Sequence, residues 1–253
     1  MPVDLITVPC LTDNYAFLVH DAATGQTALV DAPEAAPIRA ELDRRGWTLS
    51  DILITHHHDD HVQGLDPLRG DARVIGARAD AHRLPRLDSE VAEGDTLTVC
   101  GQRVEVIDVS GHTLGHVAFH MPQAKLLFTA DSLMAMGCGR LFEGTPAQMW
   151  DSLKKLRALP GDTTVCSGHE YAATNARFAL SLEPDNPALI SRAEAIREAR
   201  ENGHATVPSP LSLECRTNPF LRADDPVLAK AIDMADAQPA EIFTEIRSRR
   251  DRF

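Results

Sequence analysis

Five candidate metal ligands lie within six residues of this 253-residue chain. Residues 55–61 read THHHDDH, and the candidate ligands in this run are His56, His57, His58, Asp60 and His61. Imidazole and carboxylate groups suit a divalent transition metal. A single tetrahedral ion rarely takes so many ligands from one segment, so the spacing predicts two ions side by side, with alternate residues serving each. Two adjacent ions can generate hydroxide near neutral pH and polarise a substrate oxygen.

Three more candidate ligands follow apolar, strand-like runs, as His56 follows residues 52–55. His112 comes after residues 104–109, Asp131 after 126–130 and His169 after 164–166. Strands that release polar residues at the same end gather them at one edge of a sheet, where open α/β folds place ligand sites. Singly, these residues are ordinary loop, turn or core residues, so the prediction of a metal site rests on the four together.

Other readings of the histidines are structural. An exposed histidine tract or a tag remnant is the alternative for residues 56–58, but the run lies between an apolar strand and Asp60-His61. Histidines without the strand-end pattern are expected to have structural roles, and His116 is also a candidate partner that orients a ligand. These histidines are His57, His82, His116, His120 and His204.

Hydrophobic periodicity predicts an α/β region followed by a mostly helical one, with the boundary between residues 166 and 167. The predicted strands are 5–8, 16–20, 27–31, 51–55, 73–76, 97–99, 103–109, 125–130 and 163–166. A helix with Ile38 and Leu42 on one face ends at Gly46. Helices are also predicted from Thr145-Pro146, over 171–182, and from Asn186-Pro187, Asp225-Pro226 and Gln238-Pro239. Residues 208–210, Pro-Ser-Pro, are expected to form a rigid loop within the helical region.

Composition excludes several classes of protein. Hydrophobic residues make up 43% of the chain and charged residues 25%, as in an ordinary globular protein. No apolar stretch approaches the ~18 residues of a membrane span. The net charge of −12 disfavours nucleic acid and anionic membrane surfaces as partners. We therefore expect a small-molecule substrate, no nucleic-acid or membrane partner, and a monomer.

The five cysteines include no Cys-x-x-Cys pair, which argues against a disulfide framework or a structural zinc site. Reduced thiols, with no leader-like segment at the N-terminus, favour a cytoplasmic protein. The C-terminal run 247–252 is locally basic, which suits either a helix C-terminus or an anion-binding site.

Taken together, these motifs resemble a known family. The run 55–61, Gly111-His112, Asp131 and residues 168–171 (Gly-His-Glu-Tyr) are similar to the metallo-β-lactamase superfamily. Within it, residues 137–145 and 247–253 are similar to the hydroxyacylglutathione hydrolases, also called glyoxalase II enzymes, and select that group; residues 11–15 match as well. This chain has Arg140 and Phe142 where some members have lysine and tyrosine, and Ala130 and Ser132 where Gly-Asp-Thr is more usual.

The resemblance implies a four-layer αβ/βα sandwich with a C-terminal helical domain. Residues 1–166 would form the metal-binding domain and 167–253 the glutathione-binding one. One metal would be bound by His56, His58 and His112. A second would be bound by Asp60, His61 and His169, with Asp131 and a hydroxide bridging the two. The ions would most readily be Zn²⁺, with iron or manganese as alternatives. The implied substrate contacts are Arg140, Leu141, Phe142, Tyr171, Arg247 and Arg250.

The implied reaction is hydrolysis of S-D-lactoylglutathione to glutathione and D-lactate, the second step of methylglyoxal detoxification. Asp60 or Asp131 would orient the proton of the attacking hydroxide. The nearest alternative is a glutathione persulfide dioxygenase with a mononuclear iron site, a group that generally lacks this helical tail. A β-lactamase, lactonase or phosphodiesterase would use the same ions on another electrophile, and a non-enzymatic binding module is the third class.

Overall fold

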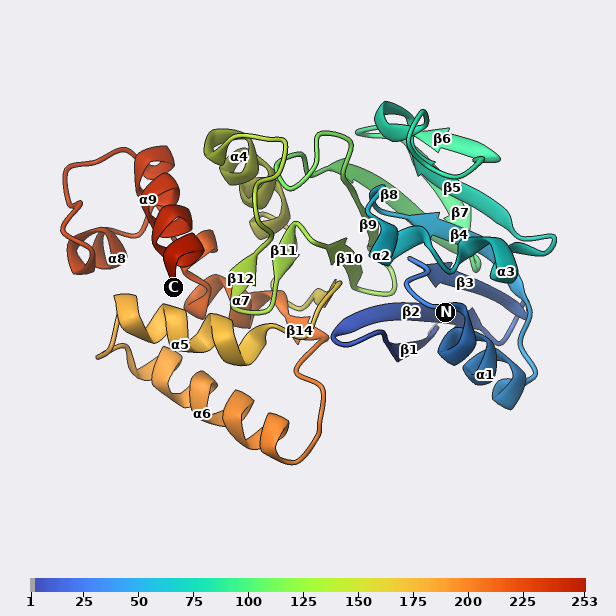
Figure 1. Cartoon of the computed structure of the whole chain (residues 1–253), viewed down its shortest axis with the longest axis horizontal. Coiled ribbons are helices and arrows are strands. Elements are labelled where there is room, and N and C mark those ends of the chain that lie inside the picture. The colour runs from blue at the N-terminus through green and yellow to red at the C-terminus, as the bar shows by residue number, and fades with distance from the viewer. Residues whose placement is uncertain (1–2) are drawn as a thin grey trace.

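The computed structural model describes residues 3–253 and contains two six-stranded sheets packed face to face (Figure 1). The first sheet takes the N-terminal strands in chain order: β1 (Asp4–Cys10), β2 (Asn14–Asp21), β3 (Gln26–Val30), β4 (Leu49–Ile54), β5 (Arg73–Ala77) and β6 (Ser89–Val91). β1, β2 and β3 form an antiparallel meander, and β3 to β6 run parallel.

The second sheet has the order β14-β13-β10-β9-β8-β7. Its strands are β7 (Thr96–Val99), β8 (Gln102–Asp108), β9 (Val117–Met121), β10 (Leu126–Ala130), β13 (Thr164–Ser167) and β14 (Ser209–Pro210). β9 pairs antiparallel with both β8 and β10, and β10 pairs parallel with β13, so β8, β10 and β13 end at the same edge. A two-stranded hairpin, β11 (Leu133–Met134) and β12 (Gly137–Cys138), lies beside this edge.

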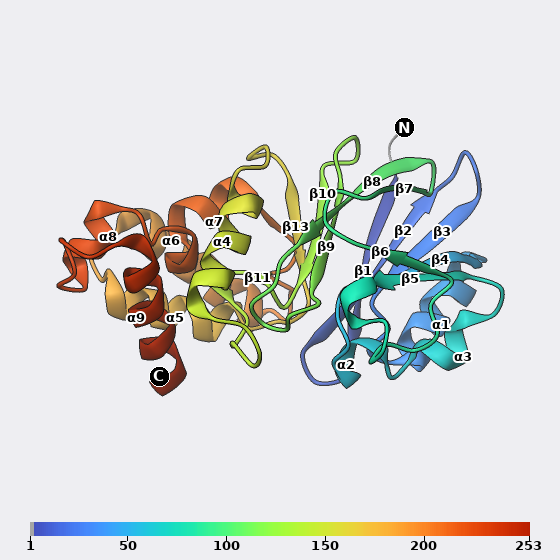
Figure 2. The same ribbon diagram turned by 90° about the horizontal axis from the view of Figure 1, so that it is seen from above.

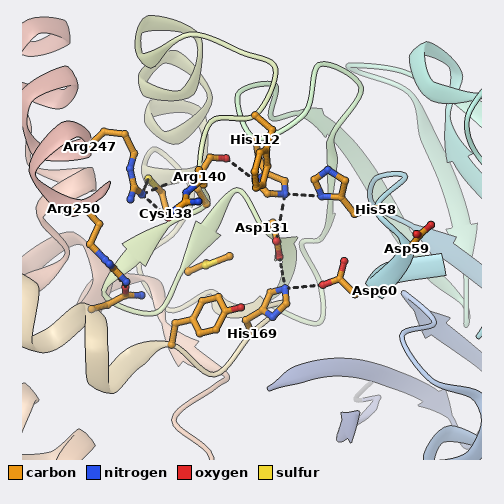
Figure 3. A pocket seen from close by; sticks show the side chains of 15 residues that line it. His58, Asp59, Asp60, His112, Asp131, Cys138, Arg140, His169, Arg247 and Arg250 are labelled. Carbon is orange, nitrogen blue, oxygen red and sulfur yellow. Dashed lines mark hydrogen bonds and ion pairs between the residues drawn. The ribbon is translucent and has the colours of Figure 1, made fainter. Parts of the chain in front are cut away.

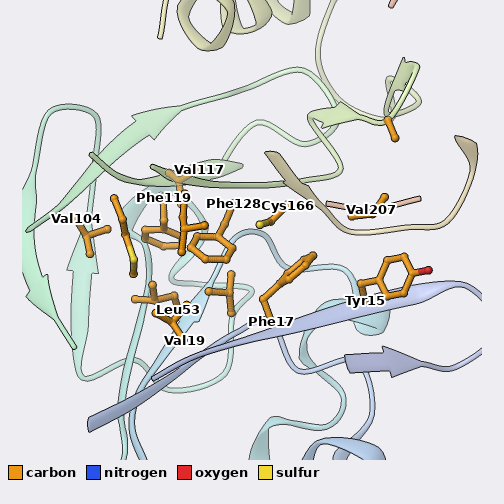
Figure 4. Close-up of a cluster of buried hydrophobic side chains, with 14 of the residues drawn as sticks. Tyr15, Phe17, Val19, Leu53, Val104, Val117, Phe119, Phe128, Cys166 and Val207 are labelled. Atoms are coloured by element: carbon orange, nitrogen blue, oxygen red, sulfur yellow. The ribbon is translucent and has the colours of Figure 1, made fainter. Parts of the chain in front are cut away.

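Alternating residues of each sheet enter different hydrophobic clusters. In β4, Leu53 points between the two sheets, where it joins Phe119 and Phe128, while Ile52 points outward against the helices. Figure 4 shows the layer between the sheets, with Val19 and Leu53 of the first sheet facing Phe119 and Phe128 of the second. The alternation gives both sheets two buried faces, as a four-layer sandwich requires.

Helices cover the two outer faces (Figure 2). On the first sheet lie α1 (Ala35–Arg45) and α3 (Leu65–Arg69), with the short α2 (Asp59–Val62) nearby. A short 3₁₀ turn, η1 (Arg78–Asp80), follows β5. The second sheet is covered by α4 (Pro146–Arg157) together with part of the C-terminal helices. The predicted four-layer architecture with a helical C-terminal region is confirmed.

The C-terminal region contains α5 (Ala172–Leu182), α6 (Pro187–Glu201), α7 (Leu211–Thr217), η2 (Pro219–Leu221), α8 (Pro226–Ala231) and α9 (Pro239–Arg252). The predicted caps form: the Thr145 hydroxyl accepts from the Gln148 amide N–H at 3.2 Å, and the Gln148 side chain accepts from the Thr145 N–H at 2.8 Å. Pro187, Pro226 and Pro239 begin α6, α8 and α9, as their position after a capping residue predicted.

Two expectations were wrong in this region. The segment 208–210 is not a loop, because Ser209 and Pro210 form β14 and pair with Val165 and Thr164. Proline is tolerated there because β14 is an edge strand. No strand lies on its outer side, so no neighbour requires a backbone N–H from Pro210. The strands therefore do not stop at residue 166: the helical region supplies the last strand of the second sheet. The predicted boundary at 166/167 also falls inside β13.

None of the helices formed by residues 3–253 combines the length and apolar character that a bilayer crossing requires.

Candidate metal site

Seven predicted ligands converge where β4 of the first sheet meets the C-terminal ends of three strands of the second. His56 and His58 follow β4, and Asp60 and His61 lie in α2 directly after them. His112 follows β8, Asp131 follows β10 and His169 follows β13. The expectation of a single sheet edge was therefore right for three strands and wrong for β4, which belongs to the other sheet. A hydrogen bond from the Val117 N–H to the Thr55 carbonyl, at 3.0 Å, links the two sheets at this point.

One half of the site contains three histidines. His58 Nδ1 lies 3.1 Å from His56 Nε2 and 3.0 Å from His112 Nε2. His112 Nε2 is also 3.4 Å from Asp131 Oδ2. These atoms are close enough to share one ion. Burial, as the main cause, lowers the pKa of each of the three imidazoles, which favours the neutral form that binds a metal.

The other half gathers around the second oxygen of the same carboxylate. Asp131 Oδ1 lies 3.4 Å from His61 Nε2 and 3.3 Å from His169 Nε2. Asp60 Oδ2 completes the group at 3.4 Å from His169 Nε2 and 3.9 Å from His61 Nε2 (Figure 3). With one oxygen directed to each half, Asp131 has the position of a bridging ligand.

Charge differs between the halves. Burial opposes protonation of His61, but the nearby carboxylates of Asp131 and Asp31 outweigh it and raise the pKa of His61 well above its usual value. Burial likewise opposes ionisation of Asp131, and His61 and His169 outweigh it, so the pKa of Asp131 falls well below its usual value. The buried carboxylate of Asp131 is therefore placed where it stabilises positive charge beside His61 and His169.

Hydrogen bonds behind the imidazoles fix their ring orientation. His56 Nδ1 lies 3.0 Å from the Thr55 hydroxyl, and that hydroxyl donates to Asp31 Oδ2 at 2.9 Å. The same Asp31 oxygen lies 2.9 Å from His61 Nδ1. Asp31 therefore orients predicted ligands in both halves, and carboxylates in this position raise the basicity of the imidazole they contact.

A second pair of supports comes from the first residue of β2 and the residue before it. Asp13 Oδ1 lies 2.8 Å from His169 Nδ1, and Asn14 Nδ2 donates to Asp60 Oδ2 at 3.0 Å. His116, considered above as an orienting partner, is fully buried and stacks on His56, with ring centroids 4.6 Å apart and planes 11° from parallel.

Sequence reasoning did not assign roles to Asp13, Asn14 or Asp31. Asp31 ends the predicted strand 27–31 and directly follows β3 (Gln26–Val30), as the predicted ligands follow their strands, so the strand-end pattern contained its signal. Asp13 and Asn14 gave no such signal, because they act from the start of a strand. The histidine His57, assigned a structural role, contacts Asp80 and does not join the ligand cluster.

The residues present fit divalent metal ions. His61 Nε2 and Asp131 Oδ1 are buried and lack a hydrogen-bond partner, although both point into the cluster. Unpaired buried polar atoms are costly, and a cation would satisfy both. Gly168 keeps the space open: a Cβ there would lie 2.6 Å from Asp131 Oδ1 and 2.9 Å from His61 Cε1.

A cavity of about 560 Å³ opens from the metal site towards α9. Figure 3 shows His58, Asp60 and His169 on one side and Arg247 and Arg250 on the other, with Arg140 between them beside His112. Of the predicted substrate contacts, Arg140, Phe142, Tyr171, Arg247 and Arg250 line it. Leu141 does not: its side chain packs against a hydrophobic cluster, so its position does not support the predicted side-chain contact.

The arginines differ in exposure and partners. Arg247 is 7% exposed and donates to the Cys138 carbonyl at 3.1 Å, so it also supports the cavity wall. Arg250 donates to the side chain of Asn175, and the guanidinium of Arg140 lies 3.7 Å from Asp251. Together they make one end of the cavity of this acidic protein positive.

The Arg140 segment also contacts the metal site. His112 Nδ1 lies 2.7 Å from the Arg140 carbonyl, and the exposed ring of Phe142 meets His58 and His112 edge-on at 5.5 and 5.3 Å. Tyr171 stacks on His169 with ring centroids 4.8 Å apart.

Comparisons with known proteins agree with this arrangement. The family model of the metallo-beta-lactamase superfamily matches residues 12–169, and that of the hydroxyacylglutathione hydrolase C-terminus matches residues 170–253. A hydroxyacylglutathione hydrolase of Ruegeria pomeroyi is 64% identical over 255 residues, covering all of both chains, and one of Rhodobacter capsulatus is 54% identical over 256 residues, also covering all of both.

Solved structures share the fold. The BLEG-1 B3 metallo-beta-lactamase superposes with a TM-score of 0.67 at 20% identity, covering 86% of this chain and 99% of the other. The protein TTHA1623 in a di-iron-bound form gives 0.62 at 26% identity, covering 86% and 100%. Because of the two family-model matches and the full-length relatives, the chain belongs to the metallo-beta-lactamase superfamily and, within it, to the hydroxyacylglutathione hydrolases.

Proposed function

We propose that this protein hydrolyses S-D-lactoylglutathione to glutathione and D-lactate, the second step of methylglyoxal detoxification. The observation that carries the proposal is one cavity with a His/Asp cluster at one end and three arginines at the other. A glutathione thioester has the matching chemistry, with a reactive carbonyl at one end and carboxylates on the tripeptide. The full-length likeness to relatives named hydroxyacylglutathione hydrolase supports the same substrate class.

Two divalent ions per chain are proposed for the cluster. His56, His58 and His112 would bind one, and Asp60, His61 and His169 the other, with Asp131 shared. Nitrogen-rich donors with carboxylates favour Zn²⁺, while iron and manganese also suit such a set. A solved relative of 26% identity is described in a di-iron-bound form. When bound, such ions supply a water of lowered pKa and polarise a carbonyl oxygen.

The chain's own carboxylates would orient the attacking water. Both carboxylates line the cavity, but Asp60 exposes 42% of its side chain and Asp131 only 9%. We therefore propose that Asp60 accepts the proton of the attacking water. The oxygen of the attacking water adds to the thioester carbonyl carbon. The C–S bond then breaks, and glutathione leaves as a thiolate. A thiol has a pKa of ~8.5, so the leaving group needs no strong general acid.

The arginine end would bind the peptide carboxylates. Arg250 and Arg140 line the cavity and can donate paired hydrogen bonds to a carboxylate. Tyr171, 38% exposed beside His169, would contact the substrate between the two ends. Residues 1–166 would supply most of the metal site, and residues 167–253 would supply His169 and most of the anion contacts.

A cytoplasmic location is proposed as well. All five cysteines are free thiols, and four are buried. Glutathione and its thioesters belong to reducing compartments, where thiols stay reduced.

The test is a thioesterase assay with S-D-lactoylglutathione on protein of measured metal content. We expect hydrolysis that disappears on chelation and returns with added zinc. Full turnover after thorough chelation would contradict the metal-dependent reaction. Oxygen consumption with glutathione persulfide, without thioester hydrolysis, would favour the dioxygenase alternative.

A further inference from the structure

A second polar network lies directly beside the metal site, centred on Asp80. This residue ends η1, and its side chain is 1% exposed. One carboxylate oxygen lies 3.0 Å from His57 Nδ1, which donates because an ionised carboxylate can only accept. The other oxygen accepts from Arg83, with Nε at 3.1 Å. Asp80 therefore ties the segment between His56 and His58 to Arg83.

Arg83 extends the network to the segment that carries the predicted substrate contacts. Its guanidinium makes a two-point contact with Glu143, through Nη1 to Oε1 and through Nη2 to Oε2 at 3.1 Å. Glu143 Oε2 also accepts from the Leu114 N–H at 2.8 Å. The network thus joins three loops of the site: residues 55–58, 110–116 and 139–144.

Close packing leaves little freedom at the centre of this network. A Cβ on Gly115 would lie 2.2 Å from Asp80 Cγ, so the 110–116 loop approaches Asp80 as only glycine allows. Arg83 and Glu143 expose 29% and 25% of their side chains, and the two-point geometry makes this pair stronger than a typical surface ion pair. The hydrogen bond from Arg83 holds the pKa of Glu143 well below its usual value, which keeps the carboxylate ionised near neutral pH.

The 139–144 loop has few other attachments near Glu143. The Phe142 N–H donates to the His112 carbonyl at 3.2 Å, and the Gly144 N–H donates to the Gly111 carbonyl at 3.1 Å. Glu143 lies between these two residues, and its pairing with Arg83 adds a side-chain attachment to the two backbone ones. Arg140 is attached separately, through its carbonyl, to His112 Nδ1. Neither Arg83 nor Glu143 lines the cavity.

We propose that Arg83 and Glu143, anchored on Asp80, are positioning residues that hold the 139–144 loop, and with it Arg140 and Phe142, over the thioester site. The proposal rests on the proposed thioester hydrolase function and adds determinants of substrate affinity that do not touch the substrate.

The experiment uses zinc-loaded full-length protein and the variants Arg83→Met, Glu143→Gln and the double variant. Methionine keeps much of the arginine stem, and glutamine can still accept from the Leu114 N–H. We expect KM for S-D-lactoylglutathione to rise roughly three- to tenfold in each single variant, with kcat within about twofold of wild type. Metal content should be unchanged. The double variant should be no worse than the worse single one, because the two residues act as one unit.

Arg78→Met is the matched control, because Arg78 starts η1 but its guanidinium lies near Glu90 and Asp95, at 4.0 and 3.8 Å, and takes no part in the Asp80–Arg83–Glu143 network. A second readout, amide hydrogen exchange at Leu114, Phe142 and Gly144, needs no substrate. These amides should exchange faster in Arg83→Met and Glu143→Gln and at the wild-type rate in Arg78→Met.

The outcomes separate the two proposals. Wild-type KM in both single variants, or an equal rise in Arg78→Met, overturns the positioning role. If the wild-type protein does not hydrolyse the thioester, the proposed function fails. In that case the amide hydrogen-exchange rates alone decide whether Arg83 and Glu143 hold the 139–144 loop. Rates unchanged from wild type in both variants would refute the positioning role.

Discussion

Asn175 connects Arg250 to the hairpin that forms the cavity wall. Its Oδ1 accepts from Arg250 Nε at 3.3 Å and Nη2 at 3.2 Å, while its Nδ2 donates to the Ala135 carbonyl at 3.0 Å. The side chain is 5% exposed, so this orientation is enforced by packing. Placement of the guanidinium at the positive end of the cavity therefore depends on an uncharged residue.

Removing either member of this pair should weaken substrate binding. We expect Arg250→Ala and Asn175→Ala to raise KM for S-D-lactoylglutathione by about tenfold, with a smaller loss in kcat, because both remove binding remote from the reacting carbonyl. Steady-state kinetics measure the split. Arg252→Ala is the control, since Arg252 is exposed, donates to the Ser248 hydroxyl and does not line the cavity. A KM equal to wild type in Arg250→Ala would remove this residue from the binding site.

Arg247 should behave differently from Arg250, although both lie on α9. Its guanidinium donates to the Cys138 carbonyl and to Asp251, and it packs over the Phe220 ring at 5.1 Å. Arg247→Ala should therefore lower the free energy of unfolding by about 1–3 kcal/mol as well as raising KM, because a buried acceptor loses its donor. Urea denaturation followed by circular dichroism gives the first quantity. An unchanged denaturation midpoint would assign Arg247 to substrate binding alone.

Metal content should distinguish a bridging ligand from a ligand of one half. We expect His58→Ala to lose about one metal ion per chain and Asp131→Asn to weaken both, since the two oxygens of Asp131 face different halves. Inductively coupled plasma mass spectrometry after gel filtration measures the stoichiometry. His204→Ala, which removes an exposed histidine away from the cluster, is the control. Equal and complete retention in both variants would contradict the ligand assignment.

The buried carboxylate of Glu214 should contribute strongly to stability. It is fully buried, pairs with Arg192, and accepts from the Met136 N–H at 2.9 Å and from Ser209 Oγ at 2.6 Å. Glu214→Ala should cost about 3–5 kcal/mol of unfolding free energy, because Arg192 would remain as an uncompensated buried charge. Chemical denaturation tests this.

Glu194→Ala serves as the comparison, because it breaks the exposed ion pair with Arg197. It should leave the denaturation midpoint where it was. Similar midpoints for both variants would show that the Glu214 network is not a determinant of stability.

Much of the candidate site could be predicted from sequence because its ligands follow buried strands. The run after residue 54 and the residues after 109, 130 and 166 all follow apolar segments, and chain direction then brings three of them to one edge. The pattern of apolar strands did not predict which of the two sheets each strand joins. β4 and β10 look alike in sequence, yet they lie in opposite sheets, because strand order is set by long-range pairing.

The strands that were missed share a physical cause. β9 is only five residues long, and His120 interrupts its apolar run after Val117, Ala118 and Phe119, so the sequence offered only a short apolar run there. β6, β11, β12 and β14 are two or three residues long and exist only through their partners. The helices were easier to predict, because caps such as Thr145 and Asn186 are local signals.

The pairing of β14 with β13 means that the C-terminal region is more than an appendage. β13 leads directly to His169, and its outer edge is covered by Ser209 and Pro210, some forty residues further along the chain. A chimaera that exchanged the tails of two relatives at residue 170 would also exchange the strand that closes this sheet. The N-terminal region with β13 and the C-terminal region with β14 would then have to be inherited together. The reason is the backbone pairing of these strands next to the predicted ligand His169, whether or not relatives share a substrate.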